Sequence, residues 1–138
     1  NVGYNGYCIK ECNINENQSL GNEWFIVYKD RECGIIDRKG NVVIPLSLGT
    51  LYAFNRNCII RSGDTTLYTK GEAIPLDKVY VCAAKHDKRV YFIAKKGRKY
   101  AVVRDDGTFV SDFKFSFEQA RQFVDIQFEG RTIVGKMV

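Results

Sequence analysis

The sequence predicts an all-β fold of antiparallel β-meander and hairpin repeats, with at most one short helix near residues 116–123. Three segments align on a glycine between two apolar runs, at Gly40, Gly71 and Gly107. Tight hairpin turns favour glycine because it adopts a positive φ at little cost. The flanking runs are short and rich in β-branched and aromatic residues, as strands are. The repeating unit is a three-stranded meander, present about three times with a partial fourth copy.

The expected elements follow the same order in each unit, within a single β-repeat domain spanning residues 1–138. Residues 1–22 hold one strand, Gly6 to Lys10, and a polar loop, and residues 23–138 form the repeat body. Strands that lead into a first turn are expected at Trp24 to Tyr28, Cys58 to Ile60, Val90 to Ala94 and Phe123 to Phe128. Strands that lead out of it are expected at Cys33 to Asp37, Thr65 to Tyr68, Tyr100 to Arg104 and Thr132 to Val134.

The last part of the chain predicts a helix and then the partial copy. Ser116 and Gln119 have the spacing of a capping box, which indicates a short helix there. Val124, Ile126 and Phe128 alternate with polar residues, which predicts a strand with one dry face. We expect this partial copy to pair with the N-terminal strand and cover a sheet edge; the alternative is that the chain is cut from a longer array. Closure into a barrel, a propeller-like ring or an open stack stays undecided at this point, as does the oligomeric state.

Composition excludes several classes of protein. With 138 residues, 45% of them hydrophobic and 27% charged, the chain is long and apolar enough to form a core and is not disordered. Its apolar runs fall short of the roughly 18–20 residues of a membrane span, so we expect no membrane partner. An odd, widely spaced set of cysteines is no disulfide framework and favours a reducing, cytoplasmic compartment. The five are Cys8, Cys12, Cys33, Cys58 and Cys82.

The net charge of +5 resides in the second half of the chain. Residues 1–69 hold 7 Lys and Arg against 7 Asp and Glu, and residues 70–138 hold 14 against 9. Four cations around Gly97 must project from a compact area, which suits an acidic protein surface or a polyanion such as nucleic acid. A solvated surface whose lysines discourage aggregation is the alternative. The candidate contact residues are Lys88, Arg89, Lys95, Lys96, Arg98 and Lys99, and the aromatic residues on the adjoining strands are Tyr91, Phe92 and Tyr100.

Catalytic chemistry has little support in the sequence. The single histidine, His86, lies in a hydrophilic turn, and nothing completes a nucleophilic dyad or a metal site with Cys82. Asp105 and Asp106 directly precede a turn glycine, where Asp serves local backbone hydrogen bonds. A glycine-rich phosphate loop is also missing. We therefore expect no enzyme activity, no cofactor and no metal.

Residues 33–45 resemble the bacterial WG repeat, also called the KWG repeat. Its consensus is Trp-Gly, an aromatic residue or Ile, Ile-Asp, two variable residues, and Gly-Lys-Val-Val-Ile-Pro. Cys33 replaces the signature Trp here. Degenerate copies follow, and the resemblance as a whole covers about four-fifths of the chain. The residues that fit are Gly34, Ile36, Asp37, Gly40, Val42, Val43, Ile44 and Pro45.

The resemblance implies a β-rich repeat module that mediates interactions and carries no catalytic residues. Combined with the missing catalytic constellation, it predicts a non-catalytic protein–protein interaction module whose protein partner is unknown, an acidic protein being one candidate. The alternative is nucleic-acid or polyanion binding through the basic hairpin at residues 95–99.

Overall fold

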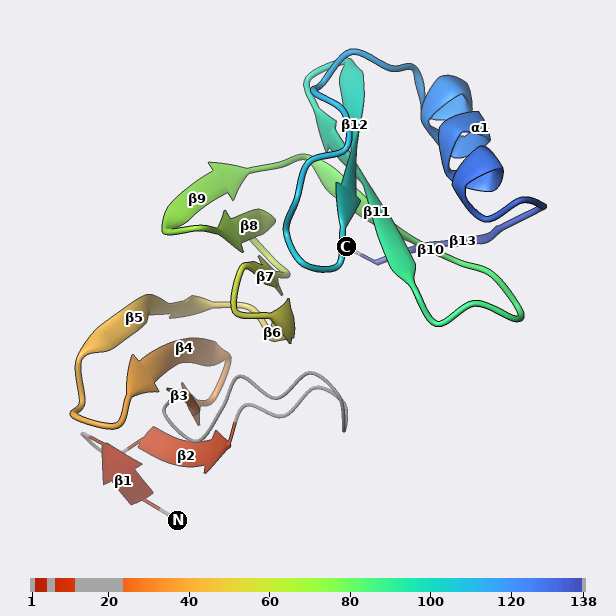
Figure 1. Ribbon diagram of the computed structural model, residues 1–138. Coiled ribbons are helices and arrows are strands. Elements are labelled where there is room, and N and C mark those ends of the chain that lie inside the picture. Colours follow the sequence, from red (N-terminus) through yellow and green to blue (C-terminus); the bar gives the residue numbers. More distant parts are fainter. Residues whose placement is uncertain (1, 5–6, 12–23, 138) are drawn as a thin grey trace.

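The computed structural model describes residues 2–4, 7–11 and 24–137, and side chains from residue 24 onward. It confirms an all-β architecture of antiparallel sheets with one helix in these ranges. Three sheets follow one another along the chain, and the helix lies beside the third (Figure 1). This helix, α1, is 11 residues long, and no described helix is long and apolar enough to cross a membrane.

The first sheet has strand order β1-β2-β3-β4-β5. Its strands are β1 (Val2–Tyr4), β2 (Tyr7–Glu11), β3 (Trp24–Lys29), β4 (Glu32–Asp37) and β5 (Val42–Leu48). β2 confirms the predicted N-terminal strand except for Gly6, which lies outside the described residues. The expectation of one strand in this part of the chain is wrong, because β1 precedes β2 and pairs with it. The polar loop expected up to residue 22 lies outside them as well, from residue 12 onward.

The other two sheets contain four strands each, in the orders β6-β7-β8-β9 and β12-β11-β10-β13. The second comprises β6 (Leu51–Asn55), β7 (Cys58–Arg61), β8 (Thr66–Thr69) and β9 (Glu72–Pro75). The third comprises β10 (Lys78–Ala83), β11 (Val90–Lys96), β12 (Lys99–Arg104) and β13 (Ile133–Lys136). β6 and β10 are strands that the three-stranded unit did not include. The connections between units thus add a strand in front of the meander that follows.

The turns lie where the glycines predicted them, but the third returning strand is reduced to two bridges. Gly40, Gly71 and Gly107 have φ values of 89°, 81° and 87°. After Gly107, the chain pairs with β12 only through the isolated bridges Val103↔Phe109 and Tyr100↔Phe115. The Ser111 hydroxyl accepts from the Val102 amide at 3.0 Å, so a side chain takes the place of a ladder carbonyl.

Helix α1 (Phe117–Gln127) confirms the capping box and overturns the strand predicted over residues 123–128. The Gln119 amide donates to the Ser116 hydroxyl at 3.1 Å, and the Ser116 amide donates to the Gln119 side chain at 2.9 Å. Ala120 and Val124 lie four residues apart and are fully buried in one cluster with β11 and β12. The strand predicted from the alternation at Val124 is therefore wrong, because the buried residues here follow the helical repeat of three to four residues and not a repeat of two.

The final strand also pairs differently from the expectation. β13 pairs with β10, through Tyr80↔Lys136, Cys82↔Val134 and the pairs between them. The N-terminal strand β2 pairs instead with β1 and β3. The turn at residues 129–131 therefore follows a helix and returns the chain to the edge of the third sheet.

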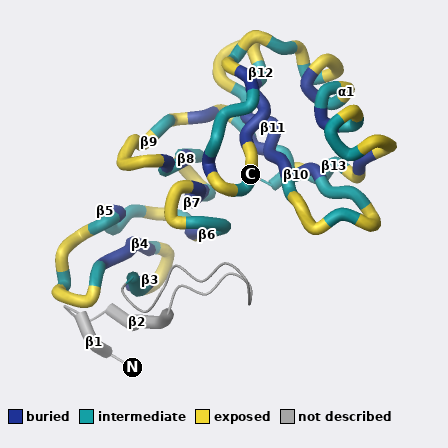
Figure 2. The backbone as a smooth tube through the Cα atoms, in the orientation of Figure 1, coloured by how far each residue is buried: buried dark blue, intermediate teal, exposed yellow. Residues whose placement is uncertain are grey.

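The interior is layered, with one apolar cluster at each contact between layers. The first cluster joins the first and second sheets through residues such as Ile35 and Ile59. The second joins the second and third sheets through residues such as Ile60 and Phe92. The third joins the third sheet to α1. Buried residues concentrate along β4, β7, β11 and β12, and the turns are exposed (Figure 2).

A buried arginine connects the first sheet to the second. Arg61, at the end of β7, is only 1% exposed. Its guanidinium donates to the carbonyls of Cys33 (2.9 Å), Ser47 (2.8 Å) and Pro45 (2.7 Å), and to the Tyr68 hydroxyl (3.2 Å). The β4–β5 register shifts here, beside a proline that has no N–H to donate. Arg61 thus supplies side-chain donors to three carbonyls at the irregular part of this strand pair.

Candidate functional site

The basic hairpin, defined as residues 95–99, is the tip that joins β11 to β12. Lys96 pairs with Lys99 across the Gly97–Arg98 turn, and Lys95 pairs with Tyr100. Lys78 of β10 lies opposite Lys95 on the other side, so a further cation joins the tip. Lys96, Arg98 and Lys99 are exposed, and Lys95 is half-buried.

The alternation of the strand sends these cations to both faces of the third sheet. Lys95 follows Tyr91 and Ile93, which pack in the cluster that contains α1. Lys96 follows Phe92 and Ala94, which pack toward the second sheet. The tip therefore presents positive charge on both sides rather than on one flat surface.

A carboxylate holds the turn in shape without neutralising it. Asp77 accepts a hydrogen bond from the Gly97 amide at 2.7 Å, and its own amide donates to the Lys95 carbonyl at 2.8 Å. The Lys96 ammonium lies 5.8 Å from the centroid of the Phe113 ring. Within residues 24–137, none of the four hairpin cations forms an ion pair with a carboxylate. The charge of the tip is therefore available to a partner.

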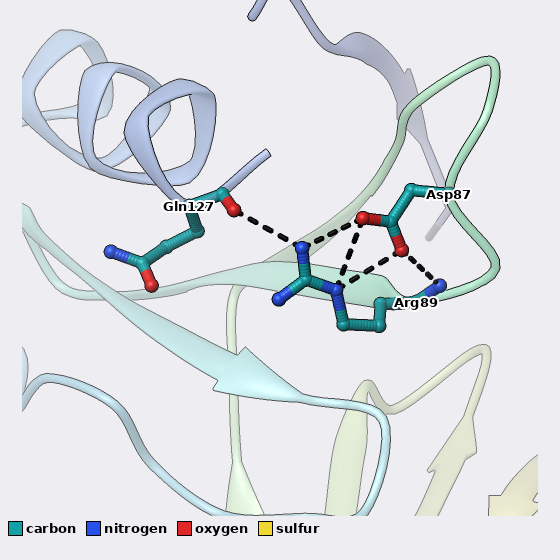
Figure 3. Close-up of polar contacts among 3 residues, drawn as sticks. All are labelled: Asp87, Arg89 and Gln127. Carbon is teal, nitrogen blue, oxygen red and sulfur yellow. Dashed lines mark hydrogen bonds and ion pairs between the residues drawn. The ribbon is translucent and has the colours of Figure 1, made fainter. Parts of the chain in front are cut away.

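Lys88 and Arg89 lie away from the basic hairpin, although the sequence places them in the same basic stretch. They precede β11, whose seven residues span about 20 Å, and the hairpin lies at its other end. Arg89 forms an ion pair with Asp87 at 2.7 Å and donates to the Gln127 carbonyl at 3.1 Å (Figure 3). It also lies over the Phe128 ring, at 5.3 Å. Arg89 thus holds the C-terminal end of α1, a position that favours a cation.

The three aromatic residues that the sequence places on the strands adjoining the hairpin pack into the fold. Tyr91 and Phe92 are 3% and 1% exposed. Tyr100 is half-buried, and its ring centroid lies 5.5 Å from that of Phe117 in α1. These rings stabilise the third sheet and its helix, so they offer little surface for stacking on a base.

The structure does not assemble a dyad from Cys82 and His86. His86 is exposed in the turn after β10, whereas Cys82 is fully buried. Burial raises the pKa of the Cys82 thiol to about 12, and burial likewise raises the pKa of the Cys58 thiol to about 12. A thiol with such a pKa is a poor nucleophile at neutral pH. Among the described residues, no cluster of His, Cys, Asp and Glu could hold a metal ion.

Comparisons with family models, curated proteins and solved structures find no match. The similarity to WG repeats therefore stays a prediction from residues 33–45.

Two grooves between the sheets were not predicted from the sequence. The Trp24 groove, about 470 Å³ in volume, lies between the first and second sheets. The Lys96 groove, about 620 Å³, lies between the second and third sheets. They share Thr69, Lys70 and Glu72, so they meet at the β8–β9 hairpin. Sequence reasoning missed them because they depend on how the sheets stack, which local patterns do not encode.

Proposed function

We propose that this chain is a non-catalytic protein-binding module that recognises an acidic segment of a partner protein through the basic hairpin. The observation that carries the proposal is the group of four cations at one turn, none of which forms an ion pair within the described residues. Charges arranged this way speed encounter with an acidic partner and select against basic ones. The hydrogen bonds of Asp77 hold the backbone of the turn in shape, which lowers the entropy lost by the turn on binding.

Nucleic-acid or polyanion binding through the same hairpin is the alternative, and its electrostatic basis is the same. Single-stranded nucleic acids are usually held by stacking on exposed rings as well as by charge. Tyr91 and Phe92 are buried, and the basic residues Lys88 and Arg89 lie at the far end of β11. These positions favour a short acidic protein segment over an extended nucleic-acid strand.

The resemblance to WG repeats, with its bacterial origin and its interaction role, supports the same proposal. Asp37 occupies the acidic position of the repeat, and its carboxylate accepts from the Lys39 amide at 2.9 Å and the Asn41 amide at 2.8 Å. An Asp in the repeat thus has a turn-stabilising role, which needs no catalytic chemistry. Turns stabilised in this way suit a module that presents its loops to a partner.

Fluorescence anisotropy with two labelled probes of equal charge tests the proposal: a Glu-rich peptide and a single-stranded oligonucleotide. The hairpin variant replaces four cations by Ser: Lys95, Lys96, Arg98 and Lys99. The matched control loses the same charge at exposed positions elsewhere: Arg31, Arg38, Lys39 and Lys85. We expect the hairpin variant to bind the peptide about tenfold more weakly or worse, and the control to bind nearly as the parent does.

Equal weakening in the two variants would overturn the proposal, because the binding would then depend on net charge alone. Unchanged binding in the hairpin variant would overturn it too. If the oligonucleotide binds far more tightly than the peptide at physiological salt, with a steep and hairpin-dependent salt response, the polyanion function replaces the proposed one.

A further inference from the structure

We propose that the Trp24 groove receives an apolar anchor side chain, preferably aromatic, from the same acidic segment that binds the basic hairpin. This inference rests on the proposed function and adds the chemistry of the ligand. The partner motif is bipartite: an apolar residue at one end and acidic residues at the other.

The Trp24 groove has the properties of a site for one large side chain. Its walls are Trp24 of β3, Pro45 of β5, and Tyr68 and Ala73 of the β8–β9 hairpin. Its volume of about 470 Å³ lies within the roughly 300–1,000 Å³ typical of ligand sites, and its lining is mostly apolar. Binding energy at protein interfaces concentrates where a large residue fills such a depression.

The charged residues that line the Trp24 groove are two cations and one carboxylate. The Arg56 guanidinium is 4.8 Å from the centroid of the Trp24 ring, and Lys70 projects from the tip of the β8–β9 hairpin. Glu72 is the carboxylate that lines the same groove. The described lining therefore carries one net positive charge beside its apolar walls.

The Trp24 groove adjoins the Lys96 groove, whose lining includes one residue of the basic hairpin. The β8–β9 hairpin separates the Trp24 groove from the Lys96 groove and lines both. Lys96 lines the second groove and belongs to the basic hairpin. The other charged residues of this groove are Lys70, Glu72 and Asp112, so its lining is balanced in charge and the positive surplus lies at the basic hairpin itself. Charge thus favours the acidic part of the segment at the hairpin end and the apolar part at the Trp24 end.

Trp24 is the single tryptophan of the chain, so its emission reports occupancy of the groove directly. Two Glu-rich peptides serve as probes, identical except that one carries Phe at one terminus and the other carries Gly. We expect the Phe peptide to shift Trp24 emission and to bind about tenfold more tightly, whereas the Gly peptide binds the basic hairpin without an emission change.

A pair of variants locates the effect. Ala73→Tyr fills the groove from an exposed strand position that lines it, and Val42→Tyr makes the same kind of change at an exposed strand position outside the lining. We expect Ala73→Tyr to abolish the advantage of the Phe peptide and to leave Gly-peptide affinity unchanged. Val42→Tyr should preserve both. Circular dichroism of the two variants checks that their folds match the parent.

The outcomes separate the two proposals. If both peptides bind equally and Trp24 emission does not change, the anchor site is refuted and the acidic-segment function stands. If the advantage of the Phe peptide survives Ala73→Tyr, the anchor binds elsewhere and the inference fails. If neither peptide binds, the proposed function fails together with the inference.

Discussion

Replacing Arg61 by Met tests the connection between the first two sheets. Met keeps an unbranched side chain of similar reach but has no N–H to donate. The change removes donors from the carbonyls of Cys33, Ser47 and Pro45, and from the Tyr68 hydroxyl. We therefore expect a large loss of stability from one side chain.

The size of the loss follows from the burial of these acceptors. A buried acceptor left without a donor costs about 1–3 kcal/mol. The Cys33 carbonyl lies in a fully buried contact, whereas those of Ser47 and Pro45 are partly buried, so water can relieve part of their cost. Removing the guanidinium also removes its own desolvation cost. Together these effects give about 3 kcal/mol, a large share of the roughly 5–15 kcal/mol that stabilises a domain.

Urea unfolding followed by far-ultraviolet circular dichroism and by Trp24 fluorescence measures this loss. Trp24 packs against the cluster at the same sheet contact, so both signals should report one transition. With a slope of about 2 kcal/mol per molar urea, the midpoint should fall by about 1.5 M. Arg38→Met, at an exposed turn position, serves as the control and should cost less than about 0.5 kcal/mol. A loss for Arg61→Met that equals the control would refute the role assigned to Arg61.

Three further predictions concern the turns, the thiols and one carboxylate. Gly107→Ala should destabilise the protein by at least about 2 kcal/mol more than Gly40→Ala. A Cβ at Gly107 would lie 1.8 Å from the Asn57 carbonyl oxygen, whereas a Cβ at Gly40 would enter open space at a similar φ. Equal losses of stability in urea titrations would contradict this prediction. Cys58 and Cys82 should react with a thiol reagent only as fast as the protein unfolds, and rapid labelling of either in native protein, located by mass spectrometry, would contradict their burial. Hydrogen bonds from Arg89, together with its charge, lower the pKa of Asp87 from 3.8 to about 2. The stabilising effect of the Asp87 carboxylate should therefore be present above pH 4 and lost as the pH falls toward 2. An NMR titration that gives an ordinary pKa for Asp87 would refute the ion pair.

The features predicted well are those whose cause is local. Gly40 and Gly71 mark hairpin turns because the turn itself requires a positive φ. Ser116 and Gln119 mark the start of α1 because the capping box is closed by residues three apart. In both cases, the residues that decide the structure are neighbours in the chain.

The features that were missed depend on neighbours distant in the sequence. Val124 and Phe128 fit a helical face as well as an alternating strand, and packing against β11 and β12 decides for the helix. Arg61 precedes a polar turn, so from the sequence alone it resembles a surface cation, whereas in the fold β5 covers it. In the sequence, Arg89 belongs to one basic stretch, whereas in the fold it contacts the end of α1.

The candidate site was predicted in part. The four cations of residues 95–99 do lie together at one exposed turn, because a two-residue connection leaves them no other arrangement. Lys88 was assigned to the same surface from sequence proximity, and the extended strand β11 separates it from them. The Trp24 groove arises from the stacking of two sheets, for which the sequence carries no short-range signal.

Chemical-shift mapping of the isotopically labelled protein with the Phe-bearing Glu-rich peptide tests the binding account most directly. We expect the amide signals that move to cluster in residues 69–73 and 95–99, with the Trp24 indole signal moving together with them. Signals from residues 87–89 and from the outer face of α1 should stay in place. Shifts confined to that opposite end of the third sheet, or spread evenly over all lysine-bearing turns, would contradict the account.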